Sequence, residues 1–301
     1  MSDVLRGERW EIARGEEGYP PALEDLSSPP ELIFGMGEKS ALVGPALAVV
    51  GARRATPYGL SIAEMSARVA AECGVTVVSG GAMGCDHAAG SGAIRAGGRT
   101  VVVSGCGADV VYPVSSRDVF EGAISSGGAV ISAQSWGTGP RRWAFPRRNA
   151  LIAALSQVLV VTEAGVRSGT MSTADAAVEL GRTVYAIPGS IFSPNSAGTN
   201  RLLSEGARVI PDEQSLALAI SLDFGVARFS EARGRLALGP IMSALLASPS
   251  RPDELAARLG ESVLTILKTL TEFEARRVVE RLPDGRYSPT REYLMGLGED
   301  S

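Results

Sequence analysis

The sequence has one histidine, His87, and only three cysteines, at Cys73, Cys85 and Cys106, with no Cys-x-x-Cys pair among them. An odd number of scattered cysteines argues against a disulfide framework and indicates reduced thiols in a cytoplasmic protein. A single histidine excludes a metal site with several histidine ligands. Any Ser-His-Asp or Cys-His site would have to use His87, which we interpret as a structural residue.

The sequence also has no apolar run of about 18 residues, so we expect no membrane-spanning segment. The first residues, MSDVLRGERWEIARGEE, are too polar for a secretory signal. Net positive charge is absent as well, since the formal net charge is −4. Proteins dedicated to duplex DNA are usually basic, so a nucleic-acid site on this chain has to be a local patch.

What the chain does have is a hydrophobic content of 45% over 301 residues, enough for one large and one small domain. Short β-branched runs alternate with helical segments, which predicts βαβ units in an α/β, extended Rossmann-like, doubly wound and mostly parallel sheet. The expected strands are 46–51, 75–80, 100–105, 128–133, 157–164, 183–189 and 207–210. The expected helices are 58–73, 86–97, 116–126, 147–156, 170–181, 198–205 and 213–221.

We divide the chain into five segments. They are an irregular N-terminal lead-in with one or two short helices (1–43), a Rossmann-like domain (44–223), a linker (224–238), a small C-terminal domain (239–291) and a tail (292–301). Within the small domain, SRPDELAARLG and ESVLTILKTLTEFE predict two helices, and VVERLPDGRYSPT predicts a hairpin that turns at Asp284-Gly285. Two helices followed by a hairpin indicate a winged helix.

Ligands of an open parallel sheet bind beyond the carboxyl ends of its strands, where glycine-rich loops here follow several strands. Loops that open helices present backbone N–H groups to anions. The loop Ser168-Gly169-Thr170, which follows Arg167, is the best candidate for a phosphate nest, and Asn200 follows a similar loop after the sixth expected strand. Taken together, these loops predict an anion-binding site.

The sharpest signal is the segment GTGPRRWAFPRRN (137–149), within a stretch that has no acidic residue between Glu121 and Glu163. Arginines neutralise phosphates, and aromatic rings stack on bases. We therefore expect this segment, together with two arginines that follow the first strand of the domain, to bind single-stranded DNA. The candidate residues are Arg53, Arg54, Arg141, Arg142, Trp143, Phe145, Arg147, Arg148 and Asn149, with Trp136 interleaved nearby.

Several familiar sites are missing. There is no Gly-x-x-x-x-Gly-Lys-[Ser/Thr] sequence, and Gly105-Cys106-Gly107 lacks the third glycine of a dinucleotide fingerprint. Asp86 and Asp109 each follow a strand, and we interpret both as helix caps rather than as an acid/base pair. We expect no catalytic residue, no metal and no cofactor.

The motifs resemble those of the DprA/Smf family of DNA-processing proteins. The similarity runs from about Tyr19 to Pro211 and is carried by VVGARRATPYG, VVSGGAMGCDHAA, VVVSGCGADVVYP, FPRRNALIAALS, EAGVRSGTMSTADAAVELGRTVYAIPGS and GTNRLLSEGA. The resemblance implies a dimeric protein that binds single-stranded DNA without strong sequence preference and loads the RecA recombinase during natural transformation. It also implies DNA contacts at Arg53 and the Phe145–Asn149 stretch, with the loops at Arg167–Thr170 and Gly198–Asn200 nearby.

The chain departs from the family pattern at three positions. Gly90 replaces a usual histidine, Ala133 a usual glutamate, and Ala144 a frequent histidine before Phe-Pro. None of these changes removes an arginine, so DNA binding is still expected, while the partner surface is left open.

Two alternatives remain. The first is a nucleotide-processing hydrolase of the related cytokinin-activating (LOG-like) type, although the glutamate of that motif is Thr173 here. The second is a nucleotide-sensing module that signals through the winged helix. The second winged-helix segment, 261–274, sets Lys268 against three glutamates. Phosphates repel such a helix, so we expect this domain to contact protein or to stabilise a dimer rather than to read a DNA sequence. The arginines that flank the hairpin could still touch a DNA backbone; they are Arg276, Arg277, Arg281 and Arg286.

Overall fold

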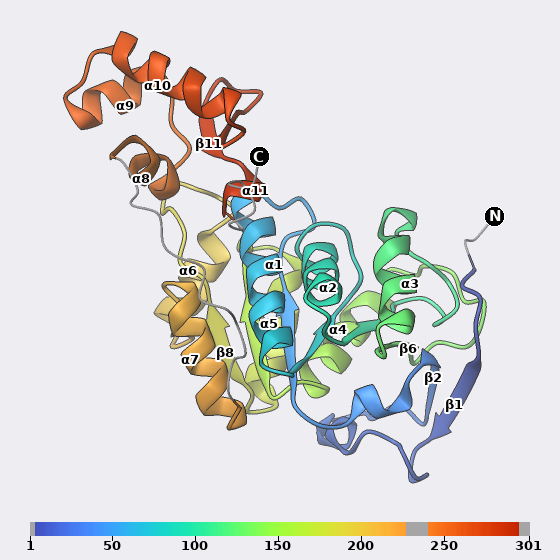
Figure 1. The fold of residues 1–301 in the computed structure, drawn as a ribbon. Helices are drawn as coiled ribbons and strands as arrows, with labels where there is room; N and C mark the ends of the chain where they lie inside the picture. The colour runs from blue at the N-terminus through green and yellow to red at the C-terminus, as the bar shows by residue number, and fades with distance from the viewer. Residues whose placement is uncertain (1–3, 227–239, 295–301) are drawn as a thin grey trace. The chain divides into compact units, whose positions relative to one another are not determined.

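The computed structural model describes residues 4–226 and 240–294. The chain forms two compact units, residues 1–230 and 231–301. The first unit is built on a nine-stranded sheet that has helices on both faces (Figure 1). The second contains helices and a two-stranded hairpin.

The elements of the first unit match the expected alternation closely. Its strands are β1 (Arg9–Ala13), β2 (Leu32–Gly37), β3 (Ala46–Val50), β4 (Thr76–Ser79), β5 (Thr100–Val103), β6 (Ala129–Ser132), β7 (Val158–Val161), β8 (Thr183–Ala186) and β9 (Arg208–Val209). Its α-helices are α1 (Pro57–Glu72), α2 (Cys85–Arg95), α3 (Arg117–Ser125), α4 (Ala144–Ala154), α5 (Gly169–Glu179), α6 (Ala197–Ser204) and α7 (Glu213–Phe224). Short 3-10 turns are η1 (Pro21–Asp25), η2 (Lys39–Leu42) and η3 (Val114–Ser116).

The strand order is β1-β2-β6-β5-β4-β3-β7-β8-β9. From β6 to β9 every neighbouring pair is parallel, whereas β1 and β2 are antiparallel. The predicted doubly wound, mostly parallel sheet is confirmed. After β3 the chain proceeds outward through β4, β5 and β6, and then returns to place β7 on the other side of β3. The pair β3/β7 is therefore the point at which the strand order reverses, where such sheets bind ligands.

The strands are apolar on both sides because both faces of the sheet are covered. In β3, Leu47 and Val49 pack into the core formed with α1, α2 and α7, whereas Ala48 and Val50 face the core formed with α4 and α5. All four side chains are at most 3% exposed. The near-continuous hydrophobic run that indicated a parallel strand thus results from burial between two layers of helices.

The N-terminal segment differs from the expectation. Residues 1–43 were predicted as an irregular lead-in, but they contribute β1 and β2, and β2 pairs with β6 from Phe34 to Gly37. The prediction was wrong because β2 (LIFGMG) contains two glycines and β1 (RWEIA) contains two charged residues, so neither shows the β-branched run of the central strands. The two strands cover the β6 edge of the sheet.

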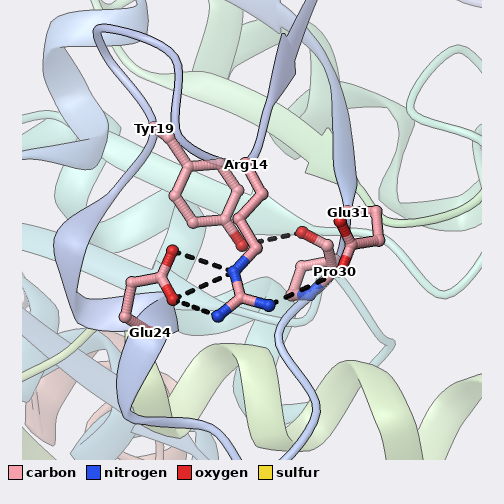
Figure 2. A network of polar contacts seen from close by, with 5 residues as sticks. All are labelled: Arg14, Tyr19, Glu24, Pro30 and Glu31. Atoms are coloured by element: carbon pink, nitrogen blue, oxygen red, sulfur yellow. Dashed lines mark hydrogen bonds and ion pairs between the residues drawn. The ribbon is translucent and has the colours of Figure 1, made fainter.

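Polar contacts hold the proline-rich turn between β1 and β2 (Figure 2). Arg14 donates hydrogen bonds to both carboxylate oxygens of Glu24 and forms a longer ion pair with Glu31. The hydroxyl of Tyr19 donates to the carbonyl oxygen of Pro30, at 2.8 Å. The hydrogen bond from Arg14 lowers the pKa of Glu24. These contacts account for an ordered turn that sequence composition presents as a loop.

The second unit contains α8 (Pro240–Ala247), α9 (Pro252–Leu259), α10 (Val263–Ala275), β10 (Val279–Arg281), β11 (Tyr287–Pro289) and α11 (Arg291–Leu294). Two helices followed by a hairpin, the predicted winged-helix order, are present, and α8 is an additional helix before them. The predicted linker 224–238 lies outside the described residues from residue 227 onward, as does the predicted tail from residue 295 onward.

Within the described ranges 4–226 and 240–294, no helix combines the length and the apolar character that crossing a bilayer requires. The same ranges hold no cluster of three or more side chains suited to binding a metal ion.

Candidate nucleic-acid interface

The candidate site lies at the carboxyl edge of the sheet, around the strand-order reversal between β3 and β7. The loop after β3 carries Arg53 and Arg54, and the loop after β7 carries Arg167 to Thr170. The hydroxyl of Thr170 donates to the carbonyl oxygen of Gly51, at 2.9 Å, and so joins the two loops. The two groups of residues predicted from separate motifs therefore lie side by side.

Most of the predicted arginines are free to meet a ligand. They are exposed, and none of them forms an ion pair with a carboxylate in the described part of the chain. They follow β3, β6 and β7 at the carboxyl edge of the sheet, the placement expected of a local basic patch on a chain whose formal net charge is −4. We call this set the arginine rim: Arg53, Arg54, Arg141, Arg142, Arg147 and Arg167.

Phe145 is the aromatic centre of this rim. Its ring lies against Gly105, where a Cβ atom would sit 2.8 Å from the ring. The guanidinium carbon of Arg53 lies 5.3 Å from the ring centroid, and the ring of Tyr112 lies at 5.9 Å with a tilted geometry. Trp143, at the start of α4, is 55% exposed. The rim thus presents partly exposed rings beside unpaired cations, the combination that binds single strands.

The side chain of Trp136 contacts the N-terminal strands. Its indole N–H donates to Glu11 of β1, at 2.7 Å, and the Arg9 guanidinium lies 4.9 Å from the ring centroid. Its ring also meets Phe34 of β2 edge-on. Trp136 therefore fastens the N-terminal strands to the loop after β6 and does not join the arginine rim.

Arg148 is buried, unlike the other arginines of the predicted DNA-binding set. It is 5% exposed, and its guanidinium donates to the carbonyl oxygens of Gly80 and Val103, the latter at 2.8 Å. The helical turn that exposes Arg147 turns its neighbour inward, beneath the ends of β4 and β5. In this structure the charge of Arg148 is used inside the protein, so the side chain is not presented at the surface for the predicted DNA contact.

Asp86 is the acidic group that faces this buried arginine. It is 7% exposed, and the backbone N–H groups of Gly51 and Ala82 donate to its carboxylate. Burial raises the pKa of Asp86 and lowers the pKa of Arg148, while the opposite charges work against both shifts. Gly80 leaves no room for a side chain between the two groups. Asp86 thus lies in the first turn of α2 but balances a buried charge rather than capping the helix.

The capping interpretation also fails for Asp109, which lies in a loop rather than at the start of a helix. Its carboxylate accepts hydrogen bonds from Arg9, at 2.7 Å, and from the backbone N–H of Gly137, at 2.8 Å. Asp109 therefore ties β1 to the loop that leads into the arginine segment.

The predicted phosphate nest opens α5. Ser168 is the N-cap and accepts from the backbone N–H of Thr170, while Gly169 is exposed. The Asn149 amide donates to Gly169 O and to the Ser172 hydroxyl, at 3.2 and 2.9 Å. Asn149 therefore connects α4 with the start of α5, close to where an anion would meet the helix N-terminus.

Asn200 is engaged with the backbone. Its amide oxygen accepts from the N–H of Gly189, and its amide nitrogen donates to the carbonyl oxygen of the same residue, at 3.1 and 3.0 Å. Both polar atoms of the side chain are used in this pair. In this structure Asn200 therefore holds the loop after β8.

Glu163 is a buried acid at the switch point that the motif analysis did not single out. It is 2% exposed, and its carboxylate accepts from the backbone N–H and the hydroxyl of Thr56, at 2.8 and 2.7 Å. Burial raises the pKa of Glu163. Burial also raises the pKa of the nearby Cys85 thiol to about 12. The position of Glu163, two residues after the end of β7, was the available signal, but only the structure shows that Glu163 supports the start of α1.

The three departures from the family pattern lie in packed surroundings. A side chain at Gly90 would collide with Val119 of α3, so the glycine permits close packing of α2 on α3. Ala144 is 3% exposed, and Ala133 packs against the main core. None of the three substitutions disturbs the arginine rim.

Comparison with known proteins identifies the family. The profile described as DNA recombination-mediator protein A matches residues 10–221, and that of the DprA winged helix domain matches residues 235–285. Protein Smf of Escherichia coli is 32% identical over 285 residues, which are 91% of this chain and 76% of that protein. The DNA processing protein DprA of Streptococcus pneumoniae is 36% identical over 201 residues, covering 67% of this chain and 71% of that protein.

Solved structures agree. The crystal structure of DprA from Streptococcus pneumoniae matches with a TM-score of 0.65 and 34% identity, over 72% of this chain and 75% of that one. DprA from Helicobacter pylori, described by its single-stranded DNA binding mode, matches with a TM-score of 0.66 and 30% identity, over 74% of this chain and all of that one. With a nine-stranded sheet, a winged helix domain and both profiles in place, this chain belongs to the DprA/Smf family of DNA-processing proteins.

Proposed function

We propose that this protein binds single-stranded DNA along the arginine rim, with little sequence preference, and that it acts without chemistry on the strand. The single observation that carries the proposal is the set of exposed, unpaired arginines around Phe145 at the β3/β7 switch point. Backbone phosphates would meet the guanidinium groups, and bases would stack on the rings. The single-stranded DNA binding described for the Helicobacter pylori relative supports this choice of ligand.

The first test is a salt titration with oligo-dT. Each neutralised phosphate of a single strand contributes about −0.7 to the log–log slope of affinity against salt, so full engagement of the rim predicts a slope of about −4. The charge-reversed pair Arg53→Glu with Arg147→Glu should remove most binding at moderate salt and flatten the slope.

The control places a charge reversal at the opposite, amino edge of the sheet. Arg99 is exposed and directly precedes β5, at the amino edge of the sheet, so Arg99→Glu should leave affinity and slope close to wild type. If Arg53→Glu/Arg147→Glu binds as tightly as wild type, the rim is not the DNA site.

The hydrolase alternative loses support at α5. The motif's glutamate is Thr173 here, and Thr173 is 2% exposed. The acid next to the switch point, Glu163, is buried behind Thr56. Release of free base from a nucleoside monophosphate by the purified protein would restore this alternative.

The nucleotide-sensing alternative uses the same edge of the sheet, since a mononucleotide phosphate could also meet the start of α5. Calorimetry separates the two ligands. We expect oligo-dT to bind and mononucleotides at equal phosphate concentration to give no measurable heat. The opposite result would favour a sensing module.

We further propose that the protein works in the cytoplasm as a homodimer and passes the bound strand to a RecA recombinase during transformation. Two leucines one turn apart on α7, Leu218 and Leu222, are 60% and 75% exposed, which supports contact with a second copy. Light scattering tests the dimer. The rate of RecA filament formation on oligo-dT, with and without this protein, tests the transfer.

A further inference from the structure

The loop after β8, residues 189–196, carries two fully solvated apolar side chains. Ile191 is 84% exposed and Phe192 is 90% exposed, the highest value among the large hydrophobic side chains that the structure describes. None of the motifs singled out in the sequence assigns these two residues a role. Such exposure of a phenylalanine and an isoleucine together indicates a contact with another molecule.

The β8 loop is held at both of its ends. Asn200 makes two hydrogen bonds with the backbone of Gly189. The hydroxyl of Tyr58, on α1, donates to the carbonyl oxygen of Pro188, at 2.9 Å. At the other end, the N–H of Gly198 donates to the carbonyl oxygen of Ala164, at 2.7 Å.

Turns inside the loop fix its tip. The N–H of Ser193 donates to Ser190 O, at 3.0 Å, and the N–H of Ser196 donates to Ser193 O, at 3.1 Å. The N–H of Phe192 itself donates to the Ser190 hydroxyl, at 3.3 Å. Phe192 is therefore presented on a preorganised turn, which lowers the entropic cost of a contact.

The tip continues the arginine rim. Strand β8 pairs with β7, and a Cβ atom at Gly165, in the loop that leads to Arg167, would lie 3.3 Å from Pro194 O. Along the carboxyl edge, Phe145 lies against the loop of β5, Arg53 follows β3, and Arg167 follows β7. Four inter-strand spacings of about 4.8 Å separate β5 from β8, or roughly 19 Å.

We propose that Phe192 is a second base-stacking platform, which takes an unpaired base of the strand after it has crossed the arginine rim, with Ile191 packing beside it. The proposal rests on the proposed function and extends its site by one strand of the sheet. Stacking on a single ring tolerates every base, because each has a π-face, so the added contact keeps the binding independent of sequence.

A base fits this tip better than a protein does. A stable protein interface buries about 800 Å² on each partner, far more than two side chains on a narrow turn supply. The neighbours of the tip are small polar residues, Ser190, Ser193 and Asn195, with Arg167 on the adjoining loop. An exposed aromatic ring on a loop next to one that carries an arginine suits the stacking of an unpaired base.

The test compares ring and apolar variants. Affinity for an oligo-dT of about 16 nucleotides should fall about tenfold in Phe192→Ala, the loss typical of one stacked base. Phe192→Leu keeps an apolar side chain without the ring and should fall similarly, whereas Phe192→Trp should bind at least as well as wild type. The matched control is Val178→Ala, since Val178 is 63% exposed in the last turn of α5, away from the carboxyl edge.

Oligonucleotide length gives an independent readout. A strand of about 4 nucleotides, the short end of known single-strand site sizes, would engage the rim alone, so Phe192→Ala should match wild type with it. Photo-crosslinking of a long oligonucleotide containing 5-iodouracil, mapped by mass spectrometry, should label Phe192.

Three other outcomes would overturn the inference, and each points to a different error. Unchanged affinity of Phe192→Ala for the long strand, while Arg53→Glu/Arg147→Glu loses binding, rules out the second platform and leaves the proposed function intact. Full binding by the arginine variant rules out both. A change of oligomeric state in Phe192→Ala, measured by light scattering, would assign the tip to protein contact instead.

Discussion

At the scale of single residues, Arg147 and Arg148 show that two neighbours of the same chemical type can lie in opposite environments. They are adjacent, and the sequence gives no reason to separate them. In the structure one is exposed on the rim, and the other is buried under the ends of β4 and β5 with Asp86 close by. We infer that Arg148 shapes the rim from beneath, because it joins α4, which carries Phe145, to two strand ends.

Removing Arg148 should therefore reduce stability. Arg148→Ala leaves Asp86 buried without its balancing charge and two carbonyl groups without donors, a change that typically costs about 3–5 kcal/mol. Urea unfolding monitored by circular dichroism measures the loss. Arg147→Ala is the matched control, expected within about 0.5 kcal/mol of wild type in stability but weaker in DNA affinity.

The double variant Asp86→Leu/Arg148→Met removes both charges and should recover part of the lost stability. Equal stability of Arg148→Ala and wild type would show that the buried arrangement contributes nothing to folding.

The buried carboxyl group of Glu163 leads to a prediction of how folding stability depends on pH. Burial raises its pKa in the folded state, so the unfolded chain ionises first as the pH rises above about 4.3, and the fold loses stability until the pH passes the raised pKa. Glu163→Gln lacks this ionisation. We expect the free energy of unfolding of Glu163→Gln, relative to that of wild type, to increase as the pH rises from 4 to 7. Urea titration at each pH measures it. A difference that does not vary with pH would contradict the assigned shift.

At the scale of elements, the N-terminal strands decide where the folding unit begins. Strand β2 covers the edge of β6, and Ile33 within it is fully buried in the main core. A chain that starts at residue 44 would expose that edge, and an uncovered strand edge promotes aggregation.

A single substitution tests the same point without truncation. Ile33→Ala should destabilise the first unit by about 2–5 kcal/mol, the usual loss for a fully buried isoleucine, seen as a lower midpoint of thermal or urea unfolding. Val43→Ala lies in the same N-terminal segment but is 50% exposed, and it should change stability by less than about 0.5 kcal/mol. Similar behaviour of the two variants would mean that β2 is dispensable.

At the scale of the whole molecule, the arginine rim of the first unit and helix α10 of the second unit differ in charge. The exposed arginines of the rim belong to the first unit. Helix α10 of the second carries one lysine against Glu272 and Glu274, and its Leu264 is 79% exposed. A helix of this kind repels phosphates and suits a protein contact.

A chain ending at residue 230 should therefore keep its affinity for oligo-dT within about twofold of the full chain and keep the same salt slope, measured by fluorescence anisotropy. The full-length chain under identical salt is the reference. A large loss of affinity, or a slope reduced by about 0.7 or more, would show that the winged helix contributes phosphate contacts.

The sequence by itself determined the parallel α/β class, the order of the central elements and the winged-helix pattern, because strands covered on both faces and capped helices leave local signals. It also predicted that Arg53, Phe145 and Arg167 lie at one edge of the sheet, since the carboxyl ends of parallel strands lie at the same edge. Only the tertiary structure decided that Arg148 is internal, that Asn200 serves the backbone and that β1 and β2 complete the sheet. Burial and edge pairing depend on residues distant in the chain, and no local pattern records them.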